Sequence, residues 1–238
     1  FNDTDFEYDA LNKISWIKGS DYKIRLSAAS SGYQSVLPLS LITRFLSDLV
    51  LDNANKEDLS IKEKKQIEKE VNKVMNDKSL TDGVKFAMLR NISSRFKYSC
   101  FVNIVEEMEL NLYPESQRSV LFDLLSYANK IELNRLVLTT HSPYVINYLT
   151  LAAKAFLLTQ KVSANETLQE RIKEVVPADS AIDPARLRIY ELKDGGVFRL
   201  STYEGLPSDE NFLNIQLGVT NELFDQLLEI EQEFDYKN

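Results

Sequence analysis

The chain has 238 residues, of which 44% are hydrophobic and 27% charged, a balance that is ordinary for a soluble globular protein with a sizeable core. Its formal net charge of −8 argues against a broad surface for nucleic acid, because phosphate-dominated binding needs clustered lysine and arginine. The single cysteine excludes an intrachain disulfide and a cysteine-rich zinc site, which favours a reducing, cytoplasmic setting.

Two further features bear on targeting. No apolar run approaches the roughly 20 residues that a membrane-spanning helix needs, and the first residues lack the basic-then-apolar pattern of a secretion signal. We therefore expect no membrane partner. The chain begins with Phe1 rather than Met, which predicts that it is a portion of a longer protein.

The first half of the chain predicts one short strand followed by helices. Alternating apolar and charged residues at 22–26 predict a half-buried strand, and a small-residue loop follows at 27–32. Apolar residues spaced by three or four predict an amphipathic helix at 34–50. The Lys- and Glu-rich stretch 53–77 predicts a solvated helix or helical hairpin, with a short coiled-coil contact as the alternative, and 84–96 predicts another helix.

The middle of the chain predicts a βαβ unit. Residues 101–105 have the character of a buried strand, 114–131 that of an amphipathic helix, and 136–140 that of a second, β-branched strand. Strand, helix and strand in this length predict two parallel strands with a right-handed connection.

The last third predicts mixed elements. The apolar stretch 154–162 predicts a further strand, and the polar stretch 161–184 predicts loops. Two alternating runs within 187–203 flank Asp194-Gly195-Gly196, which predicts a β-hairpin because these residues tolerate positive φ. An amphipathic helix is predicted at 221–234.

Polar groups follow both strands of the βαβ unit. Glu106 and Glu107 end the first strand, and Thr139, Thr140 and His141, the only histidine, end the second. Ligands of parallel α/β sheets bind outside the carboxyl ends of the strands. Because adjacent carboxylates repel each other, their placement there indicates a cation such as Mg²⁺ or a proton-transfer task.

Three stretches together resemble one family. VNIVEEMELNLYP at 102–114 resembles the Walker B and D-loop region of ABC-type P-loop ATPases, in the branch that contains the SMC, RecF and OLD-like proteins. TTHSPYVI at 139–146 resembles the switch-histidine loop of this branch, and SSGYQ at 30–34 resembles the ABC signature loop. The three stretches occur in the family's order and cover roughly residues 22–150.

The resemblance implies a fold and a domain organisation. The fold is α/β, namely the C-terminal lobe of a parallel-sheet P-loop NTPase. Residues 1–150 form the ATPase lobe, with a helical insertion at about 52–98. Residues 151–238 form a C-terminal extension of the same domain that carries the β-hairpin and a helix.

The resemblance also implies roles for the residues at the strand ends. Glu106 takes the position of the Walker B acid, which holds Mg²⁺ through water. Glu107 takes that of the general base that orients the attacking water, and His141 contacts the γ-phosphate of ATP and that water.

Two further segments of the family's site act between subunits. The resemblance implies a D-loop across a homodimer interface, formed by Asn111, Leu112, Tyr113 and Pro114. It also implies signature residues that touch the γ-phosphate of a nucleotide held mainly by the opposite subunit, namely Ser31, Gly32, Tyr33 and Gln34. This sequence departs from the family's pattern where Glu106 replaces the commoner Asp and Tyr113 stands in place of a frequent His.

One part of the family's site is missing from the sequence. A P-loop needs G-x-x-x-x-G-K-[ST] to cradle phosphates, and no pair among the seven glycines fits this spacing. In the family the P-loop lies N-terminal to the signature. We therefore expect a missing N-terminal P-loop segment as a partner, and ATP and Mg²⁺ as cofactors only in its presence.

Two other functions stay open. The chain is alternatively a non-catalytic, ATPase-like module that binds a partner through the insertion or the C-terminal hairpin and helix. The other alternative is a metal-dependent nuclease that uses Glu106, Glu107 and Glu109. Otherwise Glu109 and Glu115 are predicted to be solvated or helix-start acids. Relatives act in DNA repair, chromosome maintenance or phage defence, so DNA is an expected partner of the complete protein by resemblance only.

Overall fold

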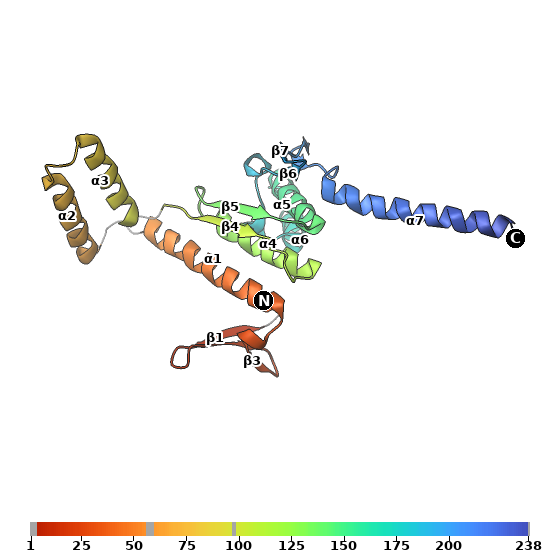
Figure 1. Ribbon diagram of the computed structural model, residues 1–238, viewed down its shortest axis with the longest axis horizontal. Coiled ribbons are helices and arrows are strands. Elements are labelled where there is room, and N and C mark those ends of the chain that lie inside the picture. The colour runs from red at the N-terminus through yellow and green to blue at the C-terminus, as the bar shows by residue number, and fades with distance from the viewer. Residues whose placement is uncertain (1–3, 56–59, 97–98, 238) are drawn as a thin grey trace.

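The computed structural model describes residues 4–55, 60–96 and 99–237. A central lobe lies beside the long helix α1, and the helical hairpin α2–α3 and the helix α7 lie at opposite ends of the molecule's longest axis (Figure 1). The N-terminal strands lie at the start of α1. The chain is α/β, as predicted, with one pair of parallel strands.

The N-terminus forms a small antiparallel sheet that extends the predicted strand at 22–26. Its strands, in the order β1-β2-β3, are β1 (Asp5–Asp9), β2 (Ile14–Lys18) and β3 (Lys23–Arg25). The carboxylate of Asp9 accepts from the backbone N–H groups of Leu11 and Asn12 and so fixes the turn between β1 and β2. A 3₁₀ turn, η1 (Leu26–Ala28), leads into the first helix.

Helix α1 (Ser31–Asn55) begins three residues earlier than predicted, so it includes the SSGYQ signature except for Ser30. Its buried side chains recur at intervals of seven, four and three residues: Val36, Thr43, Ser47 and Val50. This face packs against α4, and the amide of Asn103 in β4 donates to Thr43 Oγ1 over 3.0 Å. The helix therefore forms one wall of the central lobe.

The apolar length of α1 corrects one expectation. Residues Ser31–Asp52 are long and apolar enough to cross a membrane by length and composition, and 22% of the segment is buried. The core helix of a soluble protein passes the same test. Asp48 on this helix is paired with Arg44 at 3.8 Å and with Lys130, after α4, at 3.4 Å, which favours a helix packed on protein.

The predicted βαβ unit is confirmed. Strand β4 (Val102–Glu106) leads through α4 (Pro114–Asn129) to β5 (Arg135–Thr139), and the two strands are parallel, with Ile104 opposite Val137. One face of the pair is covered by the core, whose buried members from α4 and α5 include the following: Val120, Leu121, Leu124, Leu125, Val145 and Leu149. On the other face Val102, Ile104 and Val137 are 57%, 68% and 47% exposed.

The prediction of a strand at 154–162 is wrong, because residues 154–161 belong to α5 (Pro143–Lys161) and Val162 is the C-cap of this helix. Pro143 at the first position starts this helix, and the apolar residues that follow recur at helical spacing. The helix runs across the expected boundary at residue 150. The predicted loop at 161–184 contains a further helix, α6 (Glu166–Val175), whose cap is the side chain of Asn165.

The C-terminal region contains the predicted hairpin. Its turn has positive φ at Asp194 (52°) and Gly195 (74°), as expected. The elements of this region are η2 (Ala178–Ser180), η3 (Pro184–Arg186), β6 (Tyr190–Lys193), β7 (Gly196–Arg199), β8 (Thr202–Tyr203) and β9 (Leu206–Pro207). The closing helix α7 (Phe212–Lys237) is longer than the predicted 221–234 and extends away from the lobe (Figure 1).

Of the two predictions for the Lys- and Glu-rich stretch 53–77, a single helix or a hairpin, the described residues agree with the single helix, which forms a hairpin with the helix predicted at 84–96. This hairpin consists of α2 (Ile61–Asn76) and α3 (Asp82–Phe96), and residues 56–59 and 97–98 lie outside the described part. The Ser60 hydroxyl accepts from the Glu63 backbone while Glu63 accepts from Ser60, a capping box that starts α2. The two helices pack side by side.

Candidate functional site

The parallel register brings the two predicted strand ends together. Glu106, the last residue of β4, lies opposite Thr139, the last residue of β5. The backbone N–H of Glu107 donates to the carbonyl oxygen of Thr139 over 3.0 Å and lies 3.3 Å from its hydroxyl. The two loops that carry Glu107 and His141 therefore leave the sheet side by side.

Glu107 and His141 face each other beyond the strands. Glu107 Oε1 lies 3.5 Å from His141 Nε2, and the side chains are 47% and 84% exposed. The backbone of Glu107 is left-handed, with φ of 47°, which is uncommon for a residue other than Gly, Asn or Asp. Such conformations cost on the order of 1 kcal/mol and cluster at functional sites. A carboxylate and an imidazole that both reach solvent here can act on a bound water or ligand.

Glu109 has a different role from the one that the sequence predicted. Its Oε1 accepts a 2.6 Å hydrogen bond from the backbone N–H of His141. Among the described residues, its buried Oε2 has no hydrogen-bond partner. Glu109 is thus neither a freely solvated acid nor a helix-start acid, because it holds the loop that carries the histidine.

The loop after Glu107 consists of consecutive tight turns. The N–H of Leu110 donates to the carbonyl of Glu107 over 2.9 Å, and the N–H of Leu112 donates to that of Glu109 over 3.0 Å. Asn111 adopts φ of 61°, which asparagine tolerates well. Pro114 then occupies the first position of α4, where it needs no N–H partner.

The end of this loop presents Tyr113 to solvent. Its side chain is 85% exposed, and it is also the residue that precedes α4. The expected D-loop, Asn111 to Pro114, thus begins at the end of these tight turns and presents an exposed aromatic ring.

The expected signature lies against this turn. Gly32, in the first turn of α1, is buried, and a Cβ atom at this position would lie 2.9 Å from the carbonyl oxygen of Asn111 and 3.2 Å from Leu112 Cδ2. Glycine is therefore required for this close approach. The structure brings together two of the three stretches that carry the resemblance, although 79 positions separate Gly32 from Asn111.

The other expected signature residues have mixed surroundings. The side chain of Ser31 is exposed and that of Tyr33 half-buried. The amide of Gln34 donates to the carbonyl oxygen of Ala29 over 2.8 Å, so this side chain is used within the chain. Because α1 begins at Ser31, the signature forms a helix N-terminus, whose partial positive charge favours an anion.

A buried hydrogen-bond chain that the sequence did not predict joins the turn to the histidine loop. The hydroxyl of Ser142 donates to Gln117 Oε1 over 2.6 Å, and Gln117 Nε2 donates to the carbonyl oxygen of Leu112 over 3.0 Å. Both side chains are buried. The sequence does contain one indication of this chain of bonds: Gln117 is a polar residue on the same face of α4 as the apolar Val120, Leu121 and Leu124.

The donors fit only part of a magnesium and nucleotide site. Glu106 is exposed and offers hard oxygen donors, but within residues 4–55, 60–96 and 99–237 no group of three His, Cys, Asp or Glu side chains could hold a metal ion. Mg²⁺ in nucleotide sites takes one or two carboxylates and completes its shell with water and phosphate. Glu106 therefore suits a metal delivered with a nucleotide. It does not suit the three-carboxylate nuclease site, since Glu109 is turned to the backbone of His141.

In comparisons with known proteins, no protein-family model, curated protein or solved structure matches the chain.

Proposed function

We propose that this chain is the C-terminal lobe of an ABC-type ATPase that hydrolyses ATP at a dimer interface in the complete protein. The observation that carries the proposal is the contact of 3.5 Å between Glu107 and His141 at neighbouring ends of two parallel strands. Support comes from the packing of Gly32 against Asn111, since it joins the signature-like and D-loop-like segments.

In this proposal each of the four residues of the site has a defined task. Glu107 orients and deprotonates the attacking water, and His141 donates to the phosphate or to that water. Glu106 would hold Mg²⁺ through water, and the metal would offset the charge that develops on the phosphate. Glu109 positions His141 through its backbone.

The proposal needs a P-loop from outside this chain. The exposed apolar face of the β4–β5 pair supports this requirement, because parallel strands are normally covered on both faces. We propose that a segment bearing the P-loop adds strands and a helix here. By the same resemblance the complete protein is a cytoplasmic dimer that acts in DNA repair, chromosome maintenance or phage defence.

The test measures Mg²⁺-dependent ATP hydrolysis by a protein in which this chain is joined to a P-loop-bearing segment. We expect Glu107→Gln to lower turnover by about 10²–10⁴-fold, the usual contribution of a general base, while ATP binding persists. Glu115→Gln is the matched control, because Glu115 is an exposed acid in the first turn of α4. Normal hydrolysis by Glu107→Gln contradicts the role of this residue.

The same preparation separates the proposal from the non-catalytic alternative. An interaction module predicts that the joined protein neither hydrolyses ATP nor changes its association state when ATP is added. That result would leave Glu107 and His141 as a surface pair without a catalytic task.

A further inference from the structure

Helix α7 leaves an apolar stripe without a partner inside the described chain. Leu223, Leu227 and Ile230 are 56%, 63% and 64% exposed, and they recur at intervals of four and three residues. The helix is held to the lobe near its start, where the N–H of Phe212 donates to Glu191 Oε1 over 2.6 Å. Most helical stability comes from the packing of such a stripe, so α7 requires a partner surface.

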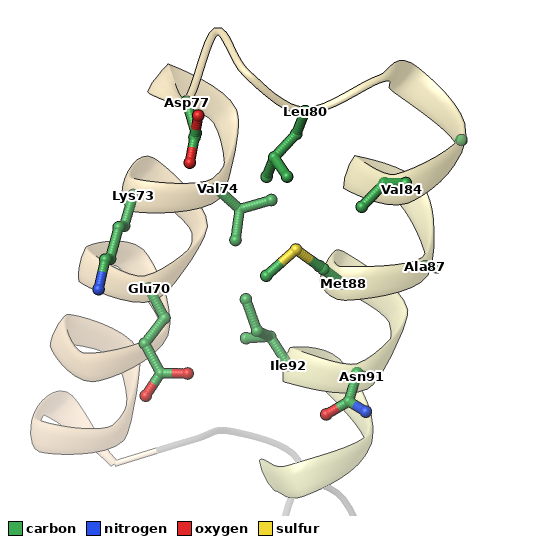
Figure 2. Close-up of a pocket in the computed structure, with 11 residues that line it drawn as sticks. Glu70, Lys73, Val74, Asp77, Leu80, Val84, Ala87, Met88, Asn91 and Ile92 are labelled. Atoms are coloured by element: carbon green, nitrogen blue, oxygen red, sulfur yellow. The ribbon is translucent and has the colours of Figure 1, made fainter.

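A matching apolar groove lies between α2 and α3. Figure 2 shows that Val74, Met88 and Ile92 point toward one another between the two helices. The groove has a volume of about 790 Å³, and its remaining apolar wall consists of Leu80, Gly83, Val84 and Ala87. Two helices leave such a groove open, and a third apolar helix would close it into a three-helix bundle.

The two elements carry opposite charge. Residues 61–96 contain nine Lys or Arg and five Asp or Glu, a net charge of +4, although the whole chain has −8. Residues 212–237 contain six Asp or Glu and one Lys, a net charge of −5. Like charges disfavour the pairing of α7 with another α7, whereas opposite charges favour its contact with the hairpin.

The charged residues also match in spacing. One side of α2 carries Lys62, Lys69 and Lys73, at intervals of seven and four residues. Lys73 lines the groove, and so do the acids Glu70 and Asp77 on the neighbouring face of α2. One side of α7 carries Glu222, Glu229 and Glu233, at the same intervals. Intervals of seven and four keep residues on one side of a helix, and both rows span about 16 Å at 1.5 Å per residue.

We propose that α7 of one copy docks into the groove between α2 and α3 of a second copy. The contact forms between copies because the hairpin and α7 lie at opposite ends of the molecule (Figure 1). Under two-fold symmetry the contact occurs twice, once in each direction. It involves none of the residues of the proposed ATPase site and stands independently of that function.

The test measures the association state of the full chain by sedimentation velocity. We expect a dimer whose Kd rises when salt is raised from about 0.05 M to about 0.5 M. Ile230→Glu on the α7 stripe and Ala87→Glu on the groove wall should each raise the Kd at least about tenfold. Both positions are exposed, so neither variant should unfold the chain. Gln232→Glu, on the opposite side of α7, is the matched control and should leave the Kd unchanged.

Mixing the two variants decides the geometry. The Ala87→Glu chain keeps an intact α7, and the Ile230→Glu chain keeps an intact groove. A mixed dimer therefore contains one unaltered contact, so the mixture should associate more tightly than either variant alone. If Ala87→Glu leaves the dimer intact and only Ile230→Glu disrupts it, α7 pairs with itself and the proposal is overturned. A chain that stays monomeric at every concentration overturns it as well.

Discussion

The backbone N–H of His141 donates a 2.6 Å hydrogen bond to Glu109 Oε1, although 32 positions separate the two residues. This bond joins the loop after β4 to the loop after β5. It holds the histidine whose ring nitrogen lies 3.5 Å from Glu107. Two acids close in sequence thus have different tasks, one facing the histidine ring and one holding its backbone.

Removing this bond should loosen the histidine loop. A hydrogen bond to a charged acceptor contributes about 1.5 kcal/mol, so we expect Glu109→Ala to raise amide hydrogen exchange at His141 about tenfold. Glu109→Gln keeps an oxygen acceptor and should change the exchange rate less. Glu115→Ala, at an exposed acid of α4, is the control, and equal exchange in all four proteins would show that the bond does not order the loop.

Gly32 gives the second prediction. In Gly32→Ala the added Cβ would lie 2.9 Å from a backbone oxygen, that of Asn111, which cannot move as a flexible side chain can. We expect the free energy of unfolding to fall by about 1–3 kcal/mol, as for other overpacked sites.

Gly83 in α3 provides the control for this substitution, because a Cβ atom there meets nothing within 4 Å. Gly83→Ala should leave the stability unchanged or raise it by about 0.5 kcal/mol, since alanine favours the helix. Urea unfolding of both variants measures the difference. If Gly32→Ala is as stable as Gly83→Ala, the signature-like and D-loop-like segments are not closely packed in solution.

The sequence predicted the part of the site that depends on local pattern. Alternation and helical spacing at 101–140 are sufficient to define the βαβ unit, and parallel pairing then brings the residues after each strand together. The proximity of Glu107 and His141 could be predicted for this reason. The contact of Gly32 with Asn111 was not predicted, because the family resemblance placed each segment at a subunit interface and gave no contact between them within one chain.

The remaining features depend on tertiary contacts that no local pattern contains. Glu109 reaches the backbone of a residue in another loop, and Gln117 reaches Ser142 across the lobe. The stretch 154–162 was misread as a strand because a short apolar run has the same composition in a buried strand and in a buried helix such as α5. Strands β1 and β2 were missed, although DFEYD in β1 alternates charged and aromatic residues as a half-buried strand does.

The buried pair of Gln117 and Ser142 leads to the third prediction. Gln117→Leu leaves the Ser142 hydroxyl and the Leu112 carbonyl without their buried partner, so we expect a loss of about 2 kcal/mol in the free energy of unfolding. Adding Ser142→Ala removes one of the two orphaned groups. The double variant should therefore be more stable, by about 1 kcal/mol, than the sum of the single losses predicts. Strict additivity would show that the two side chains do not interact.

The last prediction concerns pH and the N-terminal sheet. Glu7 Oε2 lies 2.9 Å from Lys18 Nζ, and Glu7 Oε1 lies 3.0 Å from Lys23 Nζ. Hydrogen bonds from Lys18 and then Lys23 lower the pKa of Glu7 below its ordinary value. Because the folded state lowers this pKa, the contribution of Glu7 to stability is complete above the ordinary value, about 4.3. It is lost as the pH falls through the lowered pKa.

NMR titration of the Glu7 carboxyl group measures this effect directly. Lys18→Met should raise the pKa of Glu7 toward its ordinary value, and Lys23→Met should raise it less, because Lys18 is the larger cause. Lys13→Met is the control, since Lys13 lies in the turn between β1 and β2 and forms no ion pair with Glu7 among the described residues. The fall in stability as the pH drops below about 4.3 should become smaller in Lys18→Met. An unchanged Glu7 titration in Lys18→Met would mean that the two ion pairs do not persist in solution.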